Sequence, residues 1–217
     1  MARMPVEVRR TALIEAALRV AASRGLHETT TRAIVAEAGM TLASFHYAFE
    51  SRDELIDRLI LDVLAGEEKT VLPDELEGRT LTELLTDGLH GYIEHLRADP
   101  AREQAMLELT QYALRTRLPM AKEQYAQYTR LAAVSLALAS QHTGTRWIVP
   151  LPTVAQLLVA VTDGLTLNWL VNRDDEAIDS AVRAAARAIA ALASPASPAS
   201  PASPVSAPAP RLAAAAC

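Results

Sequence analysis

Apolar residues recur every three or four positions along most of this 217-residue chain, which is the spacing of one face of an α-helix. Runs of β-branched residues are short, whereas Ala, Leu, Arg and Glu dominate. Gly and Pro interrupt the pattern at residues 66–80 and 142–152, where we expect loops. We therefore predict an all-α fold with helices at Val8–Arg24, Thr31–Ala38, Leu42–Phe49, Arg52–Ala65, Thr80–Ala98, Pro100–Leu118, Met120–Gln141, Leu151–Val171 and Glu176–Leu192.

Residues 27–55 contain two short helices joined by a tight turn. Thr30 is suited to cap the first helix, because its hydroxyl can accept a hydrogen bond from a free backbone amide. Gly39 suits the left-handed position after that helix, and the apolar Met40 can pack back on the helix end. Thr41 can cap the second helix in the same way. This arrangement predicts a helix-turn-helix, whose second helix enters the major groove of DNA.

The residues that follow extend the motif into a three-helix head. Phe45 and Phe49 lie four positions apart and are expected in its core. Ser51 and Glu54 have the spacing of a capping box that begins the next helix. The helix at Val8–Arg24 is expected to pack across the two short helices. The helix at Arg52–Ala65 has apolar residues on two sides, so we expect it to contact both this head and the helices that follow, which form the body of the protein.

The run TTRAIVAEAGMTLASFHYAFESRDEL resembles the DNA-binding segment of the TetR family of bacterial transcriptional regulators, whose usual form is close to TTxxIAxxAGVSxGTLYxHFxSKEEL. Ala43 stands where a Gly is common, and Ala48 where a His is common. The resemblance implies a homodimeric repressor with a double-stranded DNA operator as its partner. The matching residues are Thr30, Ile34, Ala38, Gly39, Phe45, Phe49, Ser51, Arg52 and Leu55.

The resemblance also assigns expected roles in DNA binding. Thr30, Ser44, Tyr47 and Arg52 match positions that hold phosphates, which fix the register without reading sequence. Leu42, Ala43 and His46 match positions near base edges, where Leu42 and Ala43 can meet a thymine methyl group. Thr41, at the N-terminus of the same helix, is also expected to point into the groove. His46 can donate to a guanine, bind a phosphate or be an ordinary surface histidine.

Charge is distributed unevenly. The chain carries −5 overall, but residues 1–52 hold seven Arg against five acidic residues. A mildly basic head on an acidic body favours a head that faces phosphate. Arg3, Arg9 and Arg10 either reach the DNA or belong to a solvated arm.

Composition divides the chain into three parts. Residues 1–52 form the predicted DNA-binding domain, and residues 53–193 a helical ligand-binding and dimerisation domain. From residue 194 the Ser-Pro-Ala repeat cannot build a core, so we predict a disordered tail at 194–217.

The aromatic residues of the body suggest a cavity for an apolar or aromatic small-molecule effector. The expected lining residues are Tyr92, Met106, Tyr125, Tyr128 and Trp169. For any one of them, an ordinary place in the core is an open alternative.

The last two helices carry apolar stripes, and two such helices from each subunit would form a four-helix bundle. The expected dimer residues are Val154, Leu158, Val161, Leu165, Ile178, Val182, Ala185 and Ile189. The same pattern fits a monomer whose stripes complete its own core.

Other functions find little support in the sequence. His90 and Glu94 can share a metal ion, but His95 falls on another face, so we expect neither metal nor cofactor. No catalytic constellation can be recognised, and Cys217 is the single cysteine. Charged residues such as Asp163 interrupt the apolar runs, so we expect no membrane span and a cytoplasmic protein.

The sequence thus predicts a ligand-responsive DNA-binding regulator that acts as a homodimer on a palindromic operator. An alternative is a regulator without a small ligand, controlled by a protein partner or by abundance. A helical carrier or enzyme with a purely structural helix-turn-helix is the third possibility.

Overall fold

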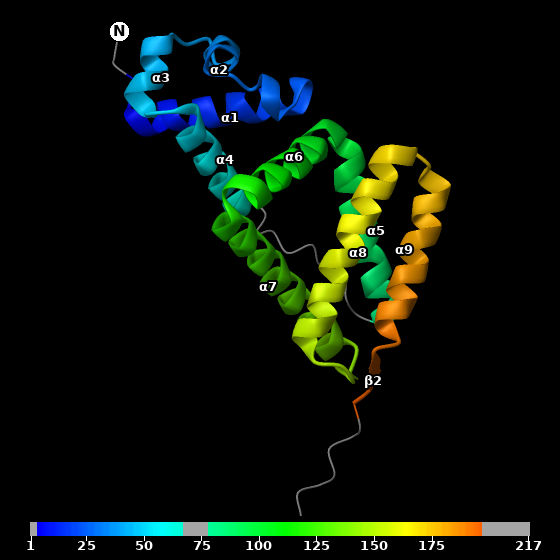
Figure 1. The fold of residues 1–217 in the computed structure, drawn as a ribbon. Coiled ribbons are helices and arrows are strands. Elements are labelled where there is room, and N and C mark those ends of the chain that lie inside the picture. The colour runs from blue at the N-terminus through cyan, green and yellow to red at the C-terminus, as the bar shows by residue number, and fades with distance from the viewer. Residues whose placement is uncertain (1–3, 67–77, 197–217) are drawn as a thin grey trace, which may run out of the picture.

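The computed structural model describes residues 4–66 and 78–196 of the chain. Figure 1 shows an all-α molecule with a small head and a larger helical body. The fold class predicted from the sequence is therefore confirmed. The described elements are α1 (Val6–Arg24), the short 3-10 helix η1 (Leu26–Glu28), α2 (Thr31–Glu37), α3 (Leu42–Ala48), α4 (Arg52–Gly66), α5 (Leu81–Ala98), α6 (Pro100–Thr116), α7 (Leu118–His142), β1 (Thr145–Trp147), α8 (Leu151–Asn172), α9 (Asp175–Ala190) and β2 (Ala193–Pro195).

Local hydrogen bonds set the turns of the head as the sequence predicts. The Thr30 hydroxyl accepts from the Ala33 amide at 3.2 Å, and the Thr41 hydroxyl accepts from the Ser44 amide at 3.2 Å. Gly39 has φ 63°, a left-handed conformation that a side chain would strain. The chain therefore turns sharply from α2 into α3.

The core of the head continues into the body. Phe45 on α3 is fully buried together with Leu13 on α1 and Leu55 on α4. Leu109 on α6 belongs to the same core, as does Ala121 on α7. The expectation that α4 contacts head and body is confirmed, and α6 makes a second connection that the sequence did not indicate.

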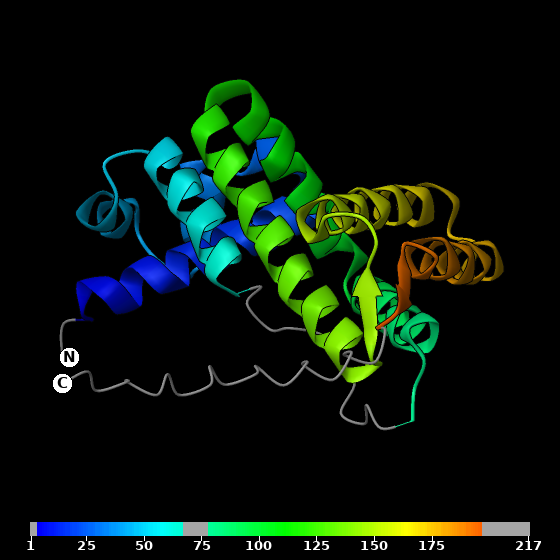
Figure 2. The ribbon, with the colours of Figure 1, turned by 90° about the horizontal axis from the view of Figure 1, so that it is seen from below.

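A separate core holds the body together between α5, α7, α8 and α9, which Figure 2 shows from below. At one edge, the Arg97 guanidinium on α5 donates to Asp175 at 2.9 Å and to Asp179 at 3.1 Å, both on α9. These contacts fix α9 against α5.

Three details differ from the sequence prediction. Pro119 was expected to separate two helices, but it lies in the first turn of α7, where its missing amide needs no partner. Residues 145–147 were expected in a loop but pair antiparallel with residues 193–195, so Ser194 and Pro195 are not part of a disordered tail. Residues 67–77 and 197–217, which include most of the predicted tail, lie outside the described residues.

Helix α8 is more apolar than the sequence analysis allowed. By length and composition it could cross a membrane, because Asp163 is the only charged residue among its 22. The single charge of Asp163 is not enough to exclude a membrane span by composition. In this fold α8 packs against α7 and α9, as a core helix does.

Candidate nucleic-acid interface and ligand cavity

Helix α3 exposes both polar and apolar side chains on the outer surface of the head. Phe45 and Ala48 turn inwards and anchor the helix on the core. The side chains predicted to meet DNA lie on the other side: Thr41, Leu42, Ala43, His46 and Tyr47 are exposed, Ser44 is half-buried, and Thr30 is exposed at the start of α2. Ala48, which stands where the usual motif has a His, is buried, and its backbone carbonyl accepts from the Arg10 guanidinium at 2.9 Å.

Arg9 and Arg10 have defined places on α1. The Arg9 guanidinium lies over the Tyr47 ring, 4.9 Å from its centroid, which keeps a positive charge beside the exposed face of α3. Arg10 lies over the ring of Phe49 and pairs with Glu54. Arg9 therefore borders the candidate interface, whereas Arg10 braces α1 against α3 and α4.

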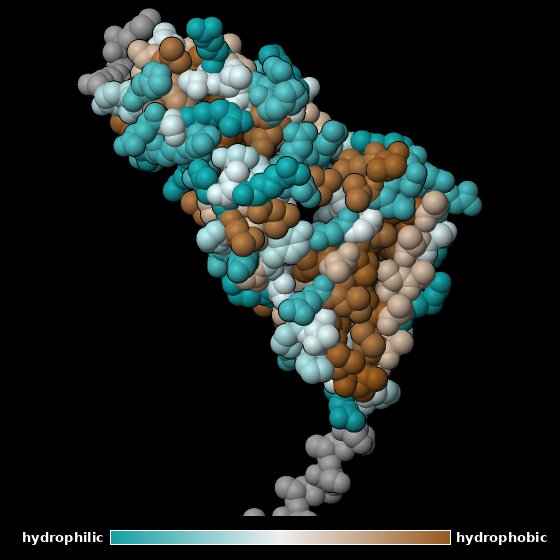
Figure 3. Space-filling model, viewed as in Figure 1, coloured by the Kyte–Doolittle hydropathy of each residue, from teal (hydrophilic) through white to brown (hydrophobic). Residues whose placement is uncertain are grey.

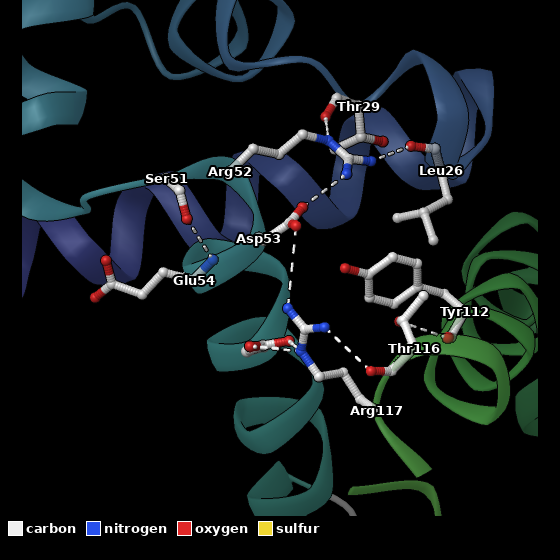
Figure 4. A network of polar contacts seen from close by, with 10 residues as sticks. Leu26, Thr29, Ser51, Arg52, Asp53, Glu54, Tyr112, Thr116 and Arg117 are labelled. Atoms are coloured by element: carbon white, nitrogen blue, oxygen red, sulfur yellow. Dashed lines mark hydrogen bonds and ion pairs between the residues drawn. The ribbon is translucent and has the colours of Figure 1, made fainter.

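Arg52 is engaged within the head rather than free to face DNA. Its guanidinium donates to the carbonyls of Thr29 at 2.6 Å and Leu26 at 2.7 Å, and it pairs with Asp53 (Figure 4). These bonds reach the carbonyl of the first residue of η1 and that of the residue just after it, and they hold the start of α4 against η1. The phosphate contact predicted for Arg52 remains untested, and no local pattern in the sequence indicates this internal role.

A second arginine joins the head to the body. Arg117, between α6 and α7, donates to the Asp57 carboxylate on α4 at 2.9 and 3.0 Å and lies 4.0 Å from Asp53 (Figure 4). The Nε–H group of Arg117 is thus shared between the two oxygens of the Asp57 carboxylate, a charge-assisted contact. The junction of α6 and α7 is thus attached to the helix that leads into the head.

Glu108 makes a third connection. Its carboxylate on α6 accepts a hydrogen bond from the backbone amide of Leu26. Because Arg52 binds the carbonyl of the same residue, η1 lies between α4 and α6. Sequence reasoning missed this site, since neither Glu108 nor η1 stands out in the helical pattern.

The body encloses a cavity of about 610 Å³ between α5, α6, α7 and α8. This volume lies in the range that accommodates small organic ligands. The lining is mainly apolar and aromatic, with a few charged groups. It comprises Gly91, Tyr92, His95, Arg102, Glu103, Met106, Leu107, Thr110, Tyr125, Tyr128, Leu131, Ala132, Leu158, Val159, Thr162, Asp163 and Thr166.

Four of the five predicted ligand residues, Tyr92, Met106, Tyr125 and Tyr128, line this cavity. That they bind a ligand remains a prediction. Trp169 lies elsewhere: its indole donates to Asp175 at 2.8 Å, and the Arg173 guanidinium lies 4.3 Å from its ring centroid. Trp169 therefore closes the turn between α8 and α9, which an aromatic count cannot reveal.

Two carboxyl groups that line the cavity have raised pKa values. Burial raises the pKa of Glu103, and nearby His95 and Arg102 counteract this. Burial likewise raises the pKa of Asp163, which the Tyr125 hydroxyl offsets in part by donating at 2.9 Å. Burial and the Asp163 carboxylate together raise the pKa of Tyr125 to about 12, so this phenol stays protonated.

The residues predicted for a dimer interface serve the protomer's own core. Five are buried in it: Val154, Leu165, Ile178, Val182 and Ile189. Leu158, Val161 and Ala185 pack against that core. In the single chain these side chains therefore pack within the protomer, and their part in a dimer remains a prediction.

The opposite face of α8 is also apolar. Leu157, Leu167 and Val171 are 41%, 56% and 72% exposed, although large aliphatic side chains usually avoid water. The small residues Ala160 and Gly164 lie between them on the exposed side. Figure 3 shows the apolar strip along α8, with the alanine-rich surface of α9 beside it.

Within residues 4–66 and 78–196, no group of three His, Cys, Asp or Glu side chains could hold a metal ion. His90 instead lies 3.9 Å from Asp179, and His95 lies 3.8 Å from Glu103. These histidines thus border acidic neighbours on different sides of α5.

Comparison with known proteins agrees with the geometry of the head. A sequence model described as "Bacterial regulatory proteins, tetR family" matches residues 13–59, from α1 into α4. The HTH-type transcriptional repressor KstR2 of Rhodococcus jostii (strain RHA1) is 34% identical over 80 residues. This alignment covers 36% of the chain and 39% of KstR2, so it spans well under half of either protein.

Solved structures extend the similarity to the body. The multidrug binding protein EbrR in complex with ethidium has a TM-score of 0.61 and 26% identity, covering 82% of this chain and 97% of EbrR. Salmonella enterica GusR has a TM-score of 0.66 at 21% identity, covering 85% of this chain and 96% of GusR, and shows the fold alone. Residues 13–59 therefore form a DNA-binding domain of the TetR family of bacterial transcriptional regulators, in a chain whose fold is that of these solved structures.

Proposed function

We propose that this protein is a cytoplasmic, non-enzymatic transcriptional repressor that binds a palindromic operator as a homodimer. A small apolar or aromatic molecule fills the cavity of the body and releases the DNA. The observation that carries the proposal is the juxtaposition along α6 of a ligand-sized cavity and the core of the head.

The exposed face of α3 supports DNA binding. Hydroxyl groups at Thr41 and Ser44 lie at its N-terminus, and His46 and Tyr47 extend the same surface. Hydroxyls, a phenol and an imidazole can bind phosphate oxygens or base edges. Arg9, beside Tyr47, adds a positive charge to this face.

The exposed face of α8 and α9 supports a homodimer. An apolar strip that includes Leu167 and Val171 suits burial against a second copy of itself, and Gly164 allows the helices to approach closely. The expected helices are those of the sequence analysis, but the contacting residues lie on the other side. Two heads must be joined to read two half-sites about 34–36 Å apart.

Helix α6 supports control by a ligand. Met106 lines the cavity and also belongs to the core of the head, so its side chain contacts both. Two residues later, Glu108 binds η1. A ligand that displaces this part of α6 must therefore move η1 or break its contacts, which changes the head.

The structures of EbrR with ethidium and with imidazole show that a relative of this fold accommodates small molecules. This favours ligand control over the alternative of a regulator governed only by a protein partner or by abundance. The cavity is a specific feature that the alternative leaves without a role.

Enrichment of genomic DNA fragments by the purified full chain tests the proposal. We expect a recovered sequence with two-fold symmetry, bound with an affinity that falls steeply as salt rises. Recovery of no preferred sequence, together with an affinity for DNA that does not depend on salt, would contradict DNA regulation.

A further inference from the structure

Asp163 has an unusual position for a carboxylate. It is the only charged residue of α8, it is half-buried, and it lines the cavity. Among the described residues its one polar partner is the Tyr125 hydroxyl, at 2.9 Å, and no Lys, Arg or His of these residues pairs with it. The negative charge of Asp163 is therefore not neutralised within the part of the chain that the structure describes.

Such a carboxylate is costly in an apolar cavity. Removal from water disfavours the ionised form, and one neutral hydroxyl donor compensates only part of that loss. The direction of the pKa of Asp163, which burial raises, agrees with this account. A cationic ligand would restore favourable interactions with the carboxylate.

The surrounding rings add a second preference for positive charge. Tyr125 and Tyr128 meet edge to face, with ring centroids 5.7 Å apart, and Tyr92 also lines the cavity. The faces of aromatic rings carry negative electrostatic potential and attract cations. Met106, Leu107 and Leu131 provide apolar surface for the rest of a ligand.

The positively charged groups of the cavity lie beside a carboxylate of their own, so they do not attract an anionic ligand as strongly as Asp163 attracts a cation. His95 lies 3.8 Å from the Glu103 carboxylate, and Arg102 acts on the same carboxylate. Glu103 thus has basic neighbours, whereas Asp163 has none among the described residues. The uncompensated charge of the cavity is negative.

We infer that the effector is an organic cation with a bulky apolar body, whose charged centre lies against Asp163 and the rings of Tyr125 and Tyr128. This inference rests on the proposed function, because it names the chemical class that the effector cavity takes.

Two probes of nearly identical shape and opposite charge provide the test: tetraphenylphosphonium and tetraphenylborate. Isothermal titration of the full chain measures the affinity of each. We expect tetraphenylphosphonium to bind at least tenfold more tightly. Asp163→Asn, which keeps the size of the side chain and an acceptor for Tyr125, should weaken binding of tetraphenylphosphonium about thirtyfold or more, in line with the loss of a partly buried charge partner.

Two further variants locate the binding. Glu15→Gln removes an exposed carboxylate on α1 that does not line the cavity, and should leave both affinities unchanged. Thr110→Trp fills part of the cavity and should abolish binding of tetraphenylphosphonium. Circular dichroism verifies that each variant is folded.

Equal affinity for the two probes, an unchanged preference in Asp163→Asn, or binding of neither probe would overturn the cation assignment. The proposed function fails by a different result. If the chain selects no operator, DNA regulation is wrong, whatever the probes do. If tetraphenylborate or both probes bind and release the operator, ligand control stands without the cation preference.

Discussion

The Glu108 carboxylate on α6 accepts a hydrogen bond from the backbone amide of Leu26, 82 positions earlier in the chain. Arg52 on α4 donates to the carbonyl of the same Leu26. The backbone amide and carbonyl of this one residue therefore join α6, which lines the cavity of the body, to the head. In our account this contact transmits the occupancy of the cavity to α3.

Glu108→Ala should weaken the coupling between effector and DNA. Removing the acceptor leaves the Leu26 amide without its carboxylate partner, and a hydrogen bond to a charged group contributes about 1.5–3 kcal/mol. We expect the factor by which effector lowers operator affinity to fall roughly tenfold, whereas effector affinity for the free protein stays within about twofold. Fluorescence anisotropy of labelled operator, with and without effector, measures this factor.

Glu108→Gln is the matched variant, because its amide oxygen can still accept from Leu26. It should keep most of the coupling. Equal coupling in the wild type and Glu108→Ala would show that the signal takes another route.

Arg52→Ala distinguishes an internal role from a phosphate contact. Losing two hydrogen bonds to the carbonyls of Thr29 and Leu26 should destabilise the protein by about 1–3 kcal/mol, measured by chemical denaturation. If the role is internal, the slope of log K against log salt for operator binding stays unchanged. A slope smaller by about 0.9 per contact would restore the phosphate role. His46→Ala, at an exposed position, serves as the control and should not alter stability.

Leu167→Asp should split the dimer while preserving the fold of the protomer. Leu167 is 56% exposed in the single chain, so the charge is tolerated there but would be buried without a partner at the interface. Analytical ultracentrifugation should show monomers, and operator affinity should fall. Leu114→Asp, at a leucine on α6 that is 48% exposed, should remain dimeric. A folded Leu167→Asp dimer would place the interface on another surface.

Asp163→Asn should make the free protein more stable at pH 7. Burial raises the pKa of Asp163 above its ordinary 3.8, so the folded state disfavours the ionised carboxyl and loses stability as pH rises through that pKa. The Asn variant has no carboxyl group to ionise at this position, so it does not lose this stability. The difference in Tm should therefore shrink and vanish as pH falls below about 4. A variant that is less stable at pH 7 would mean that the hydrogen bond from Tyr125 outweighs the cost of burial.

The parts of the fold that follow local rules could be predicted from the sequence. Thr30, Gly39 and Thr41 act on backbone groups within a few residues, so their roles in the helix-turn-helix are visible in the sequence. The contacts of Arg52 and Glu108 span 26 and 82 positions, and no local pattern indicates them.

The apolar stripes of the body were ambiguous for another reason. Val154 and Leu165 have the spacing of a buried face, but that spacing fits a protomer core and a dimer interface equally well. Because α8 is apolar on both faces, only the packing distinguishes the inner stripe from the outer residues Leu157 and Leu167. Asp163 carried a usable signal, as the single charge in that helix.

Calorimetric titration of a cavity ligand into the dimer, with and without saturating operator, tests the central claim most directly. If cavity and head are coupled through α6, operator must weaken ligand binding by the same factor as ligand weakens operator binding. Lowering the fraction of dimers that are competent to bind operator from 99% to 1% requires about 5.5 kcal/mol, which two ligands per dimer can share. We predict a large loss of ligand affinity in the presence of operator. Equal affinities in the two titrations would contradict the account.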